Sequence, residues 1–313
     1  MKVMDRIGGG SRTGIALAGI AACVSGVAVF VNGYGVRRWP DATAYTTAKN
    51  LVAAVVVLGV LGAARLGRAG AAPGHARRAG APRVGYAAVA VIGGSVPFVL
   101  FFEGLARASS ADAAFVHKLL VVFVAALAGP FLRERVGAAQ VAAIALLVAG
   151  QVALTGHLPD VGAGAGETLI LAATLSWSVE VVVAKRLLAT APVSDLAAAR
   201  LAGGVALLLA WLAVRGGIGT LTEVPAAAWG WAAATGAILA AYALAWYGAL
   251  ARARAVDVSA VLVAGALITA ALDAVVRGLP APDVLGVVLL AAGTALAVAA
   301  AVAGRRPGRV AVA

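Results

Sequence analysis

The stretch FFEGLARASSADAAFVHKLLVVFVAALAGPFLRERVGAAQVAAIALLVAG, residues 101–150, alternates long apolar runs with short segments that carry Arg, Asp and Glu. The same pattern extends along the chain of 313 residues, of which 63% are hydrophobic and only 12% are charged. Soluble domains carry about 25% charged residues, because charge covers their surface. The pattern therefore predicts a protein that lies in a lipid bilayer.

The apolar runs have the length of membrane-spanning helices, which need about 20 mostly apolar residues. Runs such as 51–61 and 284–303 do not alternate polar and apolar residues as the strands of a membrane barrel do. We therefore predict an all-α integral membrane protein. Its ten expected spans are approximately 12–35, 42–64, 84–106, 110–131, 136–155, 167–186, 195–214, 227–250, 256–277 and 283–303.

The net charge of +12 comes from Lys and Arg at the ends of these spans rather than along one groove or face, so nucleic acid is not an expected partner. With the N-terminus in the cytoplasm, cytoplasmic segments hold 17 basic residues and external loops hold 5, with three more inside spans. This asymmetry obeys the positive-inside rule and predicts that both termini are cytoplasmic. The expected location is the inner (plasma) membrane.

The two halves of the chain resemble each other. The octet Leu-Ala-Arg-Ala-Ser-Ser-Ala-Asp at 105–112 matches Leu-Ala-Arg-Ala-Arg-Ala-Val-Asp at 250–257 in five of eight positions, and Lys49 in the second span corresponds to Arg200 in the seventh. We expect a first repeat at 1–155, an external linker at 156–166 and a second repeat at 167–313.

Five spans per repeat have a geometric consequence. An odd number of spans inserts the second repeat upside down, and inverted repeats recur in secondary transporters, with the solute site near the midplane where the repeats meet. The small solute and the bilayer are therefore the expected partners. Oligomeric state is not readable, because faces of small residues serve both within and between bundles.

Residues 101–150 resemble the end of a repeat of the EamA-type transporters, in the drug/metabolite transporter superfamily. Phe131-Leu132-Arg133-Glu134-Arg135 matches the family's Leu-x-Glu-Arg element, and Gln140 and Gly150 fit the final Gly-containing span of the repeat. The resemblance covers about 290 residues and implies ten helices, an inner-membrane location and export of a small solute. The chain departs from the pattern at His117-Lys118, where Pro is frequent, and at 277–280, which lacks the second Glu.

Polar residues at membrane depth are costly, at about 2.5–3.5 kcal/mol each on insertion scales, and mark functional sites. The candidates for lining a solute cavity include His117, which titrates in the physiological range, and Lys118, which suits an anionic group such as a carboxylate. The others are Asn32 at the end of the first span and three aromatic residues deeper in their spans, Trp177, Tyr242 and Trp246. The alternative for each polar residue is a structural hydrogen bond or ion pair.

The candidates for coupling to protons are Glu180, Glu103 and Asp273. Glu103 has a simpler explanation in an i, i+4 pair with Arg107, and so has Asp273 with Arg277. A pair between Glu103 and Lys118 across spans is the alternative. Lys49 and Arg200 are expected either to neutralise a carboxylate inside the bundle or to extend to an interface.

Other function classes fit less well. No Gly-x-x-x-x-Gly-Lys-Ser/Thr loop is present, so ATP is not the expected energy source. The three histidines form no pair of metal ligands and the sequence offers no nucleophile with its base, so neither an enzyme, a metal site nor a cofactor is expected. A non-transporting structural or receptor-like bundle is the alternative function, but it leaves the inverted duplication unexplained.

Overall fold

The computed structural model describes residues 2–68, 82–105, 107–108, 110–156 and 164–303. These residues contain ten helical spans that are long and apolar enough to cross a membrane, as the sequence predicted. The spans run Arg12–Arg38, Ala42–Gly67, Arg83–Leu105, Ala113–Leu132, Ala138–Thr155, Ala165–Leu187, Val193–Val214, Ala226–Leu250, Ala255–Arg277 and Val284–Ala303.

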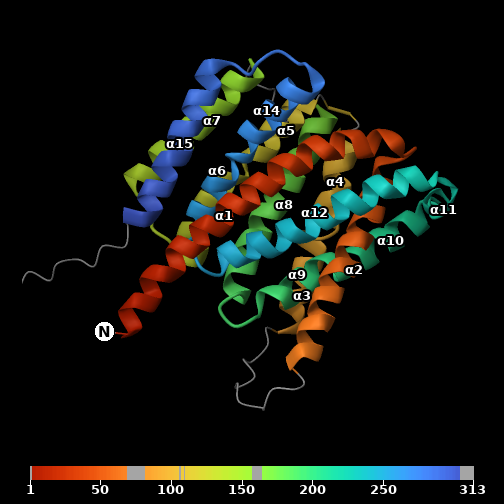
Figure 1. Cartoon of the computed structure of the whole chain (residues 1–313), viewed down its shortest axis with the longest axis horizontal. Coiled ribbons are helices and arrows are strands. Elements are labelled where there is room, and N and C mark those ends of the chain that lie inside the picture. The colour runs from red at the N-terminus through yellow and green to blue at the C-terminus, as the bar shows by residue number, and fades with distance from the viewer. Residues whose placement is uncertain (1, 69–81, 106, 109, 157–163, 304–313) are drawn as a thin grey trace, which may run out of the picture.

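Several spans consist of more than one helical element (Figure 1). The first five spans contain α1 (Lys2–Gly35), η1 (Val36–Arg38), α2 (Ala42–Arg68), α3 (Arg83–Ile92), α4 (Val96–Leu105), α5 (Ser110–Lys118), α6 (Leu120–Leu127), η2 (Ala128–Leu132) and α7 (Ala138–Thr155). The remaining elements are α8 (Ala165–Leu187), α9 (Val193–Ala198), η3 (Ala199–Gly203), α10 (Gly204–Val214), α11 (Thr220–Glu223), α12 (Ala226–Leu250), α13 (Ala255–Leu262), α14 (Gly265–Arg277) and α15 (Val284–Ala303).

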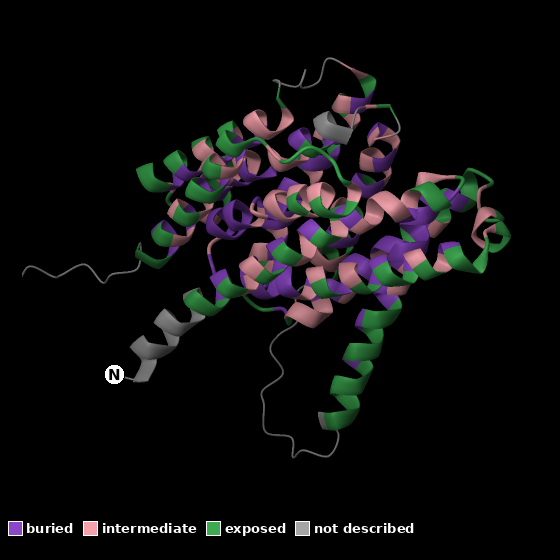
Figure 2. Cartoon of the chain, turned by 45° about the horizontal axis from the view of Figure 1, so that its top comes forward, coloured by how far each residue is buried: buried purple, intermediate pink, exposed green. Residues whose placement is uncertain are grey.

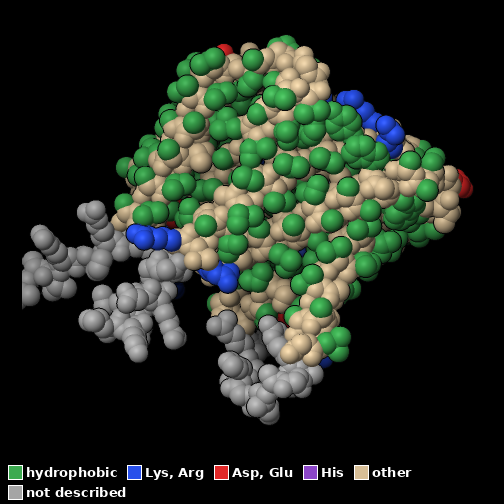
Figure 3. Space-filling view, viewed as in Figure 1, with side chains coloured by type: hydrophobic (Ala, Val, Ile, Leu, Met, Phe, Trp, Pro, Cys, Tyr) green, Lys and Arg blue, Asp and Glu red, His purple; other side chains and the backbone are tan. Residues whose placement is uncertain are grey.

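The outer surface of the bundle is apolar. Large side chains such as Val55, Leu66 and Val275 are exposed by 63%, 78% and 83%, and hydrophobic side chains cover the face in Figure 3, with Lys and Arg near its rims. Figure 2 shows the buried residues gathered in the middle of the bundle. An apolar surface of this extent requires lipid around it, so the chain is a multi-pass membrane protein.

Contacts between span ends define the two ends of the bundle. At one end Lys185 Nζ donates to the carbonyl oxygens of Leu250 and Ala253, and the Arg186 guanidinium donates to the carbonyl oxygen of Phe131. We call this the basic end. At the other end, which we call the opposite end, Trp39 Nε1 donates to Ala228 O at 3.2 Å.

These contacts give the two repeats opposite orientations. Gly14, in the first span, packs against Ala253 at the basic end, whereas Gly166, in the sixth, packs against Ala108 at the opposite end. The first span of the first repeat therefore starts at the basic end, whereas the first span of the second repeat starts at the opposite end. Most of the predicted linker at 156–166 lies outside the described residues.

The helix of the third span is interrupted just before Pro97. Pro97 has no N–H to donate to Gly93 O, four residues earlier, and the helix stops at Ile92 and resumes at Val96. Trp177 Nε1 donates to Gly93 O at 3.0 Å instead, and Ser176 Oγ donates to Ile92 O at 2.9 Å. The break thus joins the third span to α8.

Candidate functional site

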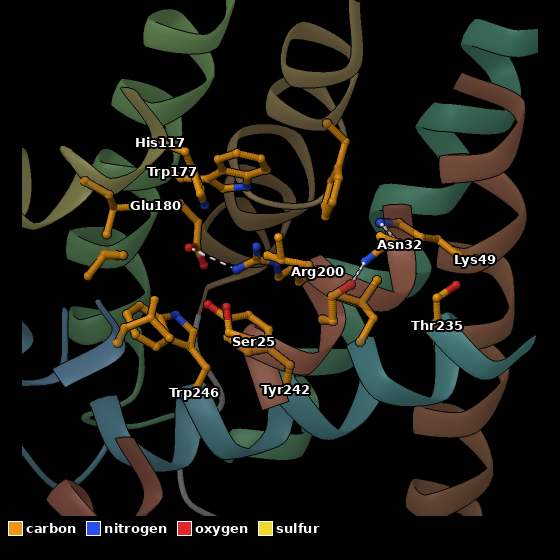
Figure 4. A pocket seen from close by; sticks show the side chains of 17 residues that line it. Ser25, Asn32, Lys49, His117, Trp177, Glu180, Arg200, Thr235, Tyr242 and Trp246 are labelled. Atoms are coloured by element: carbon orange, nitrogen blue, oxygen red, sulfur yellow. Dashed lines mark hydrogen bonds and ion pairs between the residues drawn. The ribbon is translucent and has the colours of Figure 1, made fainter. Parts of the chain in front are cut away.

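A cavity of about 170 Å³ lies in the middle of the bundle, between spans of both repeats (Figure 4). Its walls come from α1, α2, α4, α5, α6, α8, η3, α12 and α13. The polar and aromatic residues that line it are Ser25, Asn32, Lys49, Phe98, His117, Trp177, Glu180, Arg200, Thr235, Tyr242 and Trp246.

Arg200 occupies a buried ion pair on one side of the cavity. Its Nη1 lies 3.2 Å from Glu180 Oε2, and the two side chains are 8% and 1% exposed. Tyr247 donates its hydroxyl hydrogen to Glu180 Oε1 at 2.6 Å, and the Arg200 guanidinium carbon lies 5.9 Å from the Tyr247 ring centroid. Both carboxylate oxygens of Glu180 are therefore engaged, and the charge of Arg200 is balanced.

Lys49 faces the cavity from the other repeat and has a different partner. Its Nζ donates to the amide oxygen Oδ1 of Asn32 at 3.2 Å, and it lies 5.0 Å from the centroid of the Phe102 ring. Tyr45 Oη also lies 2.8 Å from Asn32 Oδ1, and 3.0 Å from Thr235 Oγ1. Among the described residues no carboxylate lies within 4.0 Å of Lys49 Nζ.

Aromatic rings form the remaining walls. The His117 ring packs edge-on against Trp177 at 5.0 Å between centroids, and its buried Nδ1 has no hydrogen-bond partner among the described residues. Phe98 packs edge-on against Trp177 at 5.4 Å. On α12, Tyr242 and Trp246 are one helical turn apart, and their rings stack at 6.0 Å with an angle of 14° between planes. Such rings offer flat apolar faces to a solute.

Local backbone features bring Arg200 to the cavity. Residues 199–203 form a π-helical turn in the seventh span, an arrangement that is frequent at functional sites because it shifts the side chains of one turn. Gly94 lies directly against this turn, so that a Cβ at position 94 would overlap the carbonyl oxygen of Arg200. Gly93 has the same relation to Glu180, whose Cγ lies 2.5 Å from the place of a Cβ.

Most of the residues chosen from the sequence meet in this cavity, including Asn32, His117, Trp177 and Glu180. Lys118 does not line it. It is the last residue of α5, and it lines a separate small pocket together with Leu147, Gln151 and Val263. The two neighbours at 117 and 118 thus face different parts of the bundle, as adjacent helical residues do.

Glu103 and Asp273 lie near the opposite end and not at the cavity. Glu103 pairs with Arg107 at 3.0 Å and also with Arg215, and a pair with Lys118 is not among its contacts. Asp273 lies 2.9 Å from Arg277 within the same helix. Both carboxylates therefore form the predicted i, i+4 ion pair with an Arg of their own span.

Sequence reasoning missed Tyr45, whose hydroxyl contacts Asn32, and Thr235, whose hydroxyl contacts that of Tyr45 and so links α12 to α2. Tyr45 precedes Lys49 by one helical turn, so the two share a face of α2, and this spacing is the signal that could have found it. No spacing of this kind in the sequence points to Thr235. In the part of the chain that the structure describes, no group of three His, Cys, Asp or Glu side chains is arranged to hold a metal ion.

A bundle of ten membrane spans in two oppositely oriented repeats, with a charged cavity between them, defines a membrane transporter fold. The family model of the EamA-like transporter family matches the chain twice, over residues 12–156 and 164–299. The chain therefore belongs to the EamA-like transporter family, as its sequence resemblance indicated, and it is a membrane transporter.

The fold is shared with a protein of known structure. A solved structure titled "Crystal structure of protein" is similar to this chain with a TM-score of 0.69 and 20% sequence identity. The match covers 94% of this chain and 99% of the other, so the likeness extends over the whole bundle. No curated protein matches the sequence.

Proposed function

We propose that this chain is a secondary transporter that exports a small solute by alternating access through the central cavity. The observation that carries the proposal is the position of the cavity: it lies between two oppositely oriented repeats, and each repeat contributes one buried cation, Lys49 or Arg200. Inverted repeats allow two related conformations, one open to each side.

Contacts at the basic end support a conformation that is closed there. The Glu134 carboxylate accepts hydrogen bonds from the backbone N–H groups of Ala255 (2.9 Å) and Val256 (3.3 Å), at the first turn of α13. Lys185 of the sixth span donates a hydrogen bond to the eighth span, and Arg186 donates one to the fourth span. Asn32, in the part of the first span nearer the opposite end, remains partly exposed beside the cavity.

We place the basic end in the cytoplasm of the cell, at the inner membrane, because basic residues are concentrated on the cytoplasmic side of membrane proteins. A conformation closed at the basic end is then an outward-facing one. Labelling single cysteines at Arg186 and Arg215 in intact cells tests this orientation, and an external reagent should modify only the second. The protein's single native cysteine, Cys23, is first replaced by Ser.

A reversible cross-link tests alternating access. With Cys23 replaced, cysteines at Phe131 and Arg186 stand at a contact that must open for access from the basic end. Proteoliposomes are loaded with a mixture of amino acids, organic acids, purines and amines, and exchange with the external solution is followed by mass spectrometry. A short cleavable bis-maleimide should stop exchange, and cleavage should restore it.

The single Phe131→Cys variant, treated with the same reagent, is the matched control and should remain active. Exchange that continues when the 131–186 cross-link has formed would contradict alternating access. A chain that exchanges nothing in this screen, although it is folded and correctly inserted, would favour the non-transporting bundle.

Proton coupling through Glu180 is part of the proposal. Its carboxylate is the only acidic group that lines the cavity in the described part of the chain, and it holds both Arg200 and Tyr247. A proton on Glu180 would release the ion pair and change the hydrogen bonding at the junction of α8, η3 and α12. Flux of Glu180→Gln should then no longer respond to an imposed pH gradient, whereas wild-type flux should.

A further inference from the structure

The charges that line the cavity do not cancel. Lys49 and Arg200 contribute two positive charges and Glu180 one negative charge, which leaves one positive charge with His117 neutral. The side chains of Arg200 and Glu180 are paired at 3.2 Å. The excess therefore belongs to Lys49, on the side of the first repeat.

A buried lysine without an acid partner is uncommon, because a charge removed from water is normally paired. Lys49 is 5% exposed. An ammonium group has three donors, and the structure gives Lys49 Nζ one hydrogen bond, to Asn32. Two N–H groups of a buried cation thus remain for a ligand in the cavity.

The partner of Lys49 is held as a neutral acceptor. Asn32 Nδ2 donates to Ala28 O at 2.7 Å, and this bond turns Oδ1 toward Lys49 and Tyr45. The amide stabilises the ammonium group without neutralising it. An anion that enters the cavity meets a preformed cation, whereas a cation is repelled.

The rest of the cavity suits a flat apolar group. Trp177, Phe98 and the Tyr242–Trp246 stack present ring faces and edges to it. Its volume of about 170 Å³ is close to that of an engineered apolar cavity of about 150 Å³ that binds benzene. Glu180 is the only acidic group that lines the cavity in the described part of the chain, and its charge is already balanced by Arg200, so the cavity offers no unpaired negative charge to an amino group.

We propose that the transported solute is a small monocarboxylate with a planar apolar body and no amino group, and that Lys49 binds its carboxylate while the aromatic walls hold its body. This inference rests on the proposed function, because it names the substrate class of that same cavity. It assigns Lys49 to the solute rather than to the structure of the bundle.

The test measures binding to the purified full-length protein in detergent by equilibrium dialysis, with protein-free micelles as the blank. The probes are benzoate, neutral benzamide and cationic benzylamine, which share one ring and differ in charge. Wild-type protein should bind benzoate about tenfold or more tightly than benzamide, the ratio expected for a hydrogen bond to a charged group. Benzylamine should bind more weakly than benzamide.

Two variants separate a binding role from a structural one. Lys49→Met should lose the preference for benzoate and keep the affinity for benzamide. Asn32→Asp retains Lys49 but gives it an acid partner, so it should also weaken benzoate binding. Lys118→Met is the matched control, because it removes a lysine of the same repeat that does not line the cavity, and it should bind benzoate like the wild type.

Equal binding of benzoate and benzamide by the wild type would overturn the inference, as would full benzoate affinity in folded Lys49→Met or Asn32→Asp. Exchange of only neutral or cationic solutes, blocked by the 131–186 cross-link, would overturn the inference and leave the proposed transport intact. Benzoate binding that depends on Lys49, without any cross-link-sensitive exchange, would support the binding site and contradict transport.

Discussion

The two buried cations of the cavity occupy corresponding places in the two repeats but have different partners. Lys49 lies over the ring of Phe102, and Arg200 lies over the ring of Tyr247. Phe102 and Tyr247 are separated by the same interval along the chain as the octets that begin at Leu105 and Leu250. The duplication has therefore preserved a cation over an aromatic ring in both repeats.

The difference lies in the acceptor that each cation binds. Arg200 binds a carboxylate, Glu180, whereas Lys49 binds an amide, Asn32. One repeat thus holds a closed ion pair and the other an open positive charge. In our proposal, the same inherited geometry therefore serves a proton-sensitive ion pair in the second repeat and solute binding in the first.

The largest effect is expected where a charge loses its partner. Arg200→Ala leaves Glu180 buried without its cation, and breaking a buried pair in this way costs about 3–5 kcal/mol. Lys49→Met leaves only a neutral amide behind and should cost clearly less. Thermal unfolding of the two purified variants in detergent measures the difference. An equal decrease in Tm for the two variants would contradict the predicted difference between the two cations.

A second large effect is expected at the glycines that face the two cation-bearing helices. A Cβ at Gly94 would overlap Arg200 O, and a Cβ at Gly236 would lie 2.6 Å from Lys49 O. Backbone atoms cannot move aside as flexible side chains do, so each Ala substitution should destabilise by about 1–3 kcal/mol, more at Gly94 than at Gly236. Gly59→Ala is the control, because nothing lies within 4 Å of the added Cβ.

The ten spans and the opposite orientation of the two repeats could be predicted from sequence, because span length, the repeated octets and the odd number of spans per repeat can be read directly from the chain. The cavity was predicted less completely. Glu180 and Trp177 stood out as polar or aromatic residues deep in a span, but the choice between His117 and Lys118 depends on helix rotation. Packing of α5 against α7 and α8 fixes that rotation, and the sequence of one segment does not encode it.

The pairing of Lys49 with Asn32 was also beyond the sequence. Lys49 and Arg200 are predicted from the sequence as corresponding cations, each of which either neutralises a carboxylate or extends to an interface, and an amide partner was not among these alternatives. The structure gives one of them an amide, since the first span carries Asn32 beside Lys49 and the carboxylate of Glu180 comes from α8. Such a choice depends on which helices are neighbours in space.

The two repeats also differ in how their fourth and fifth spans are joined, and a moderate effect is expected there. Glu134 accepts hydrogen bonds from two backbone N–H groups at the start of α13, whereas residues 277–280 of the second repeat include no Asp or Glu. Loss of a helix N-terminal cap costs about 1 kcal/mol, so Glu134→Gln should increase the population that is open at the basic end about fivefold.

A cysteine at Ser259, which is 1% exposed and lies one turn beyond this cap, reports that opening by its rate of maleimide labelling. Cys23 is replaced in all variants. Glu223→Gln, at an exposed position of the opposite end, is the control and should label like the wild type. An unchanged rate in Glu134→Gln would show that the cap does not hold the basic end closed.

The smallest effect is expected for an ion pair outside the core. Glu103 pairs with Arg107 and Arg215, whose side chains are 49% and 41% exposed. Exposed pairs of this kind contribute about 0–1 kcal/mol, so Glu103→Gln should hardly change Tm, in contrast to Arg200→Ala. A loss as large as that of Arg200→Ala would refute the ranking of these pairs by burial.

Pro97 deprives Gly93 of its normal helical donor, and the indole of Trp177 supplies the replacement. That same indole is a wall of the cavity. A solute that contacts the ring is therefore one hydrogen bond away from the break in the third span. Any change in the bend of that span would move the Trp177 wall, so we expect solute occupancy and the bend of the third span to be coupled.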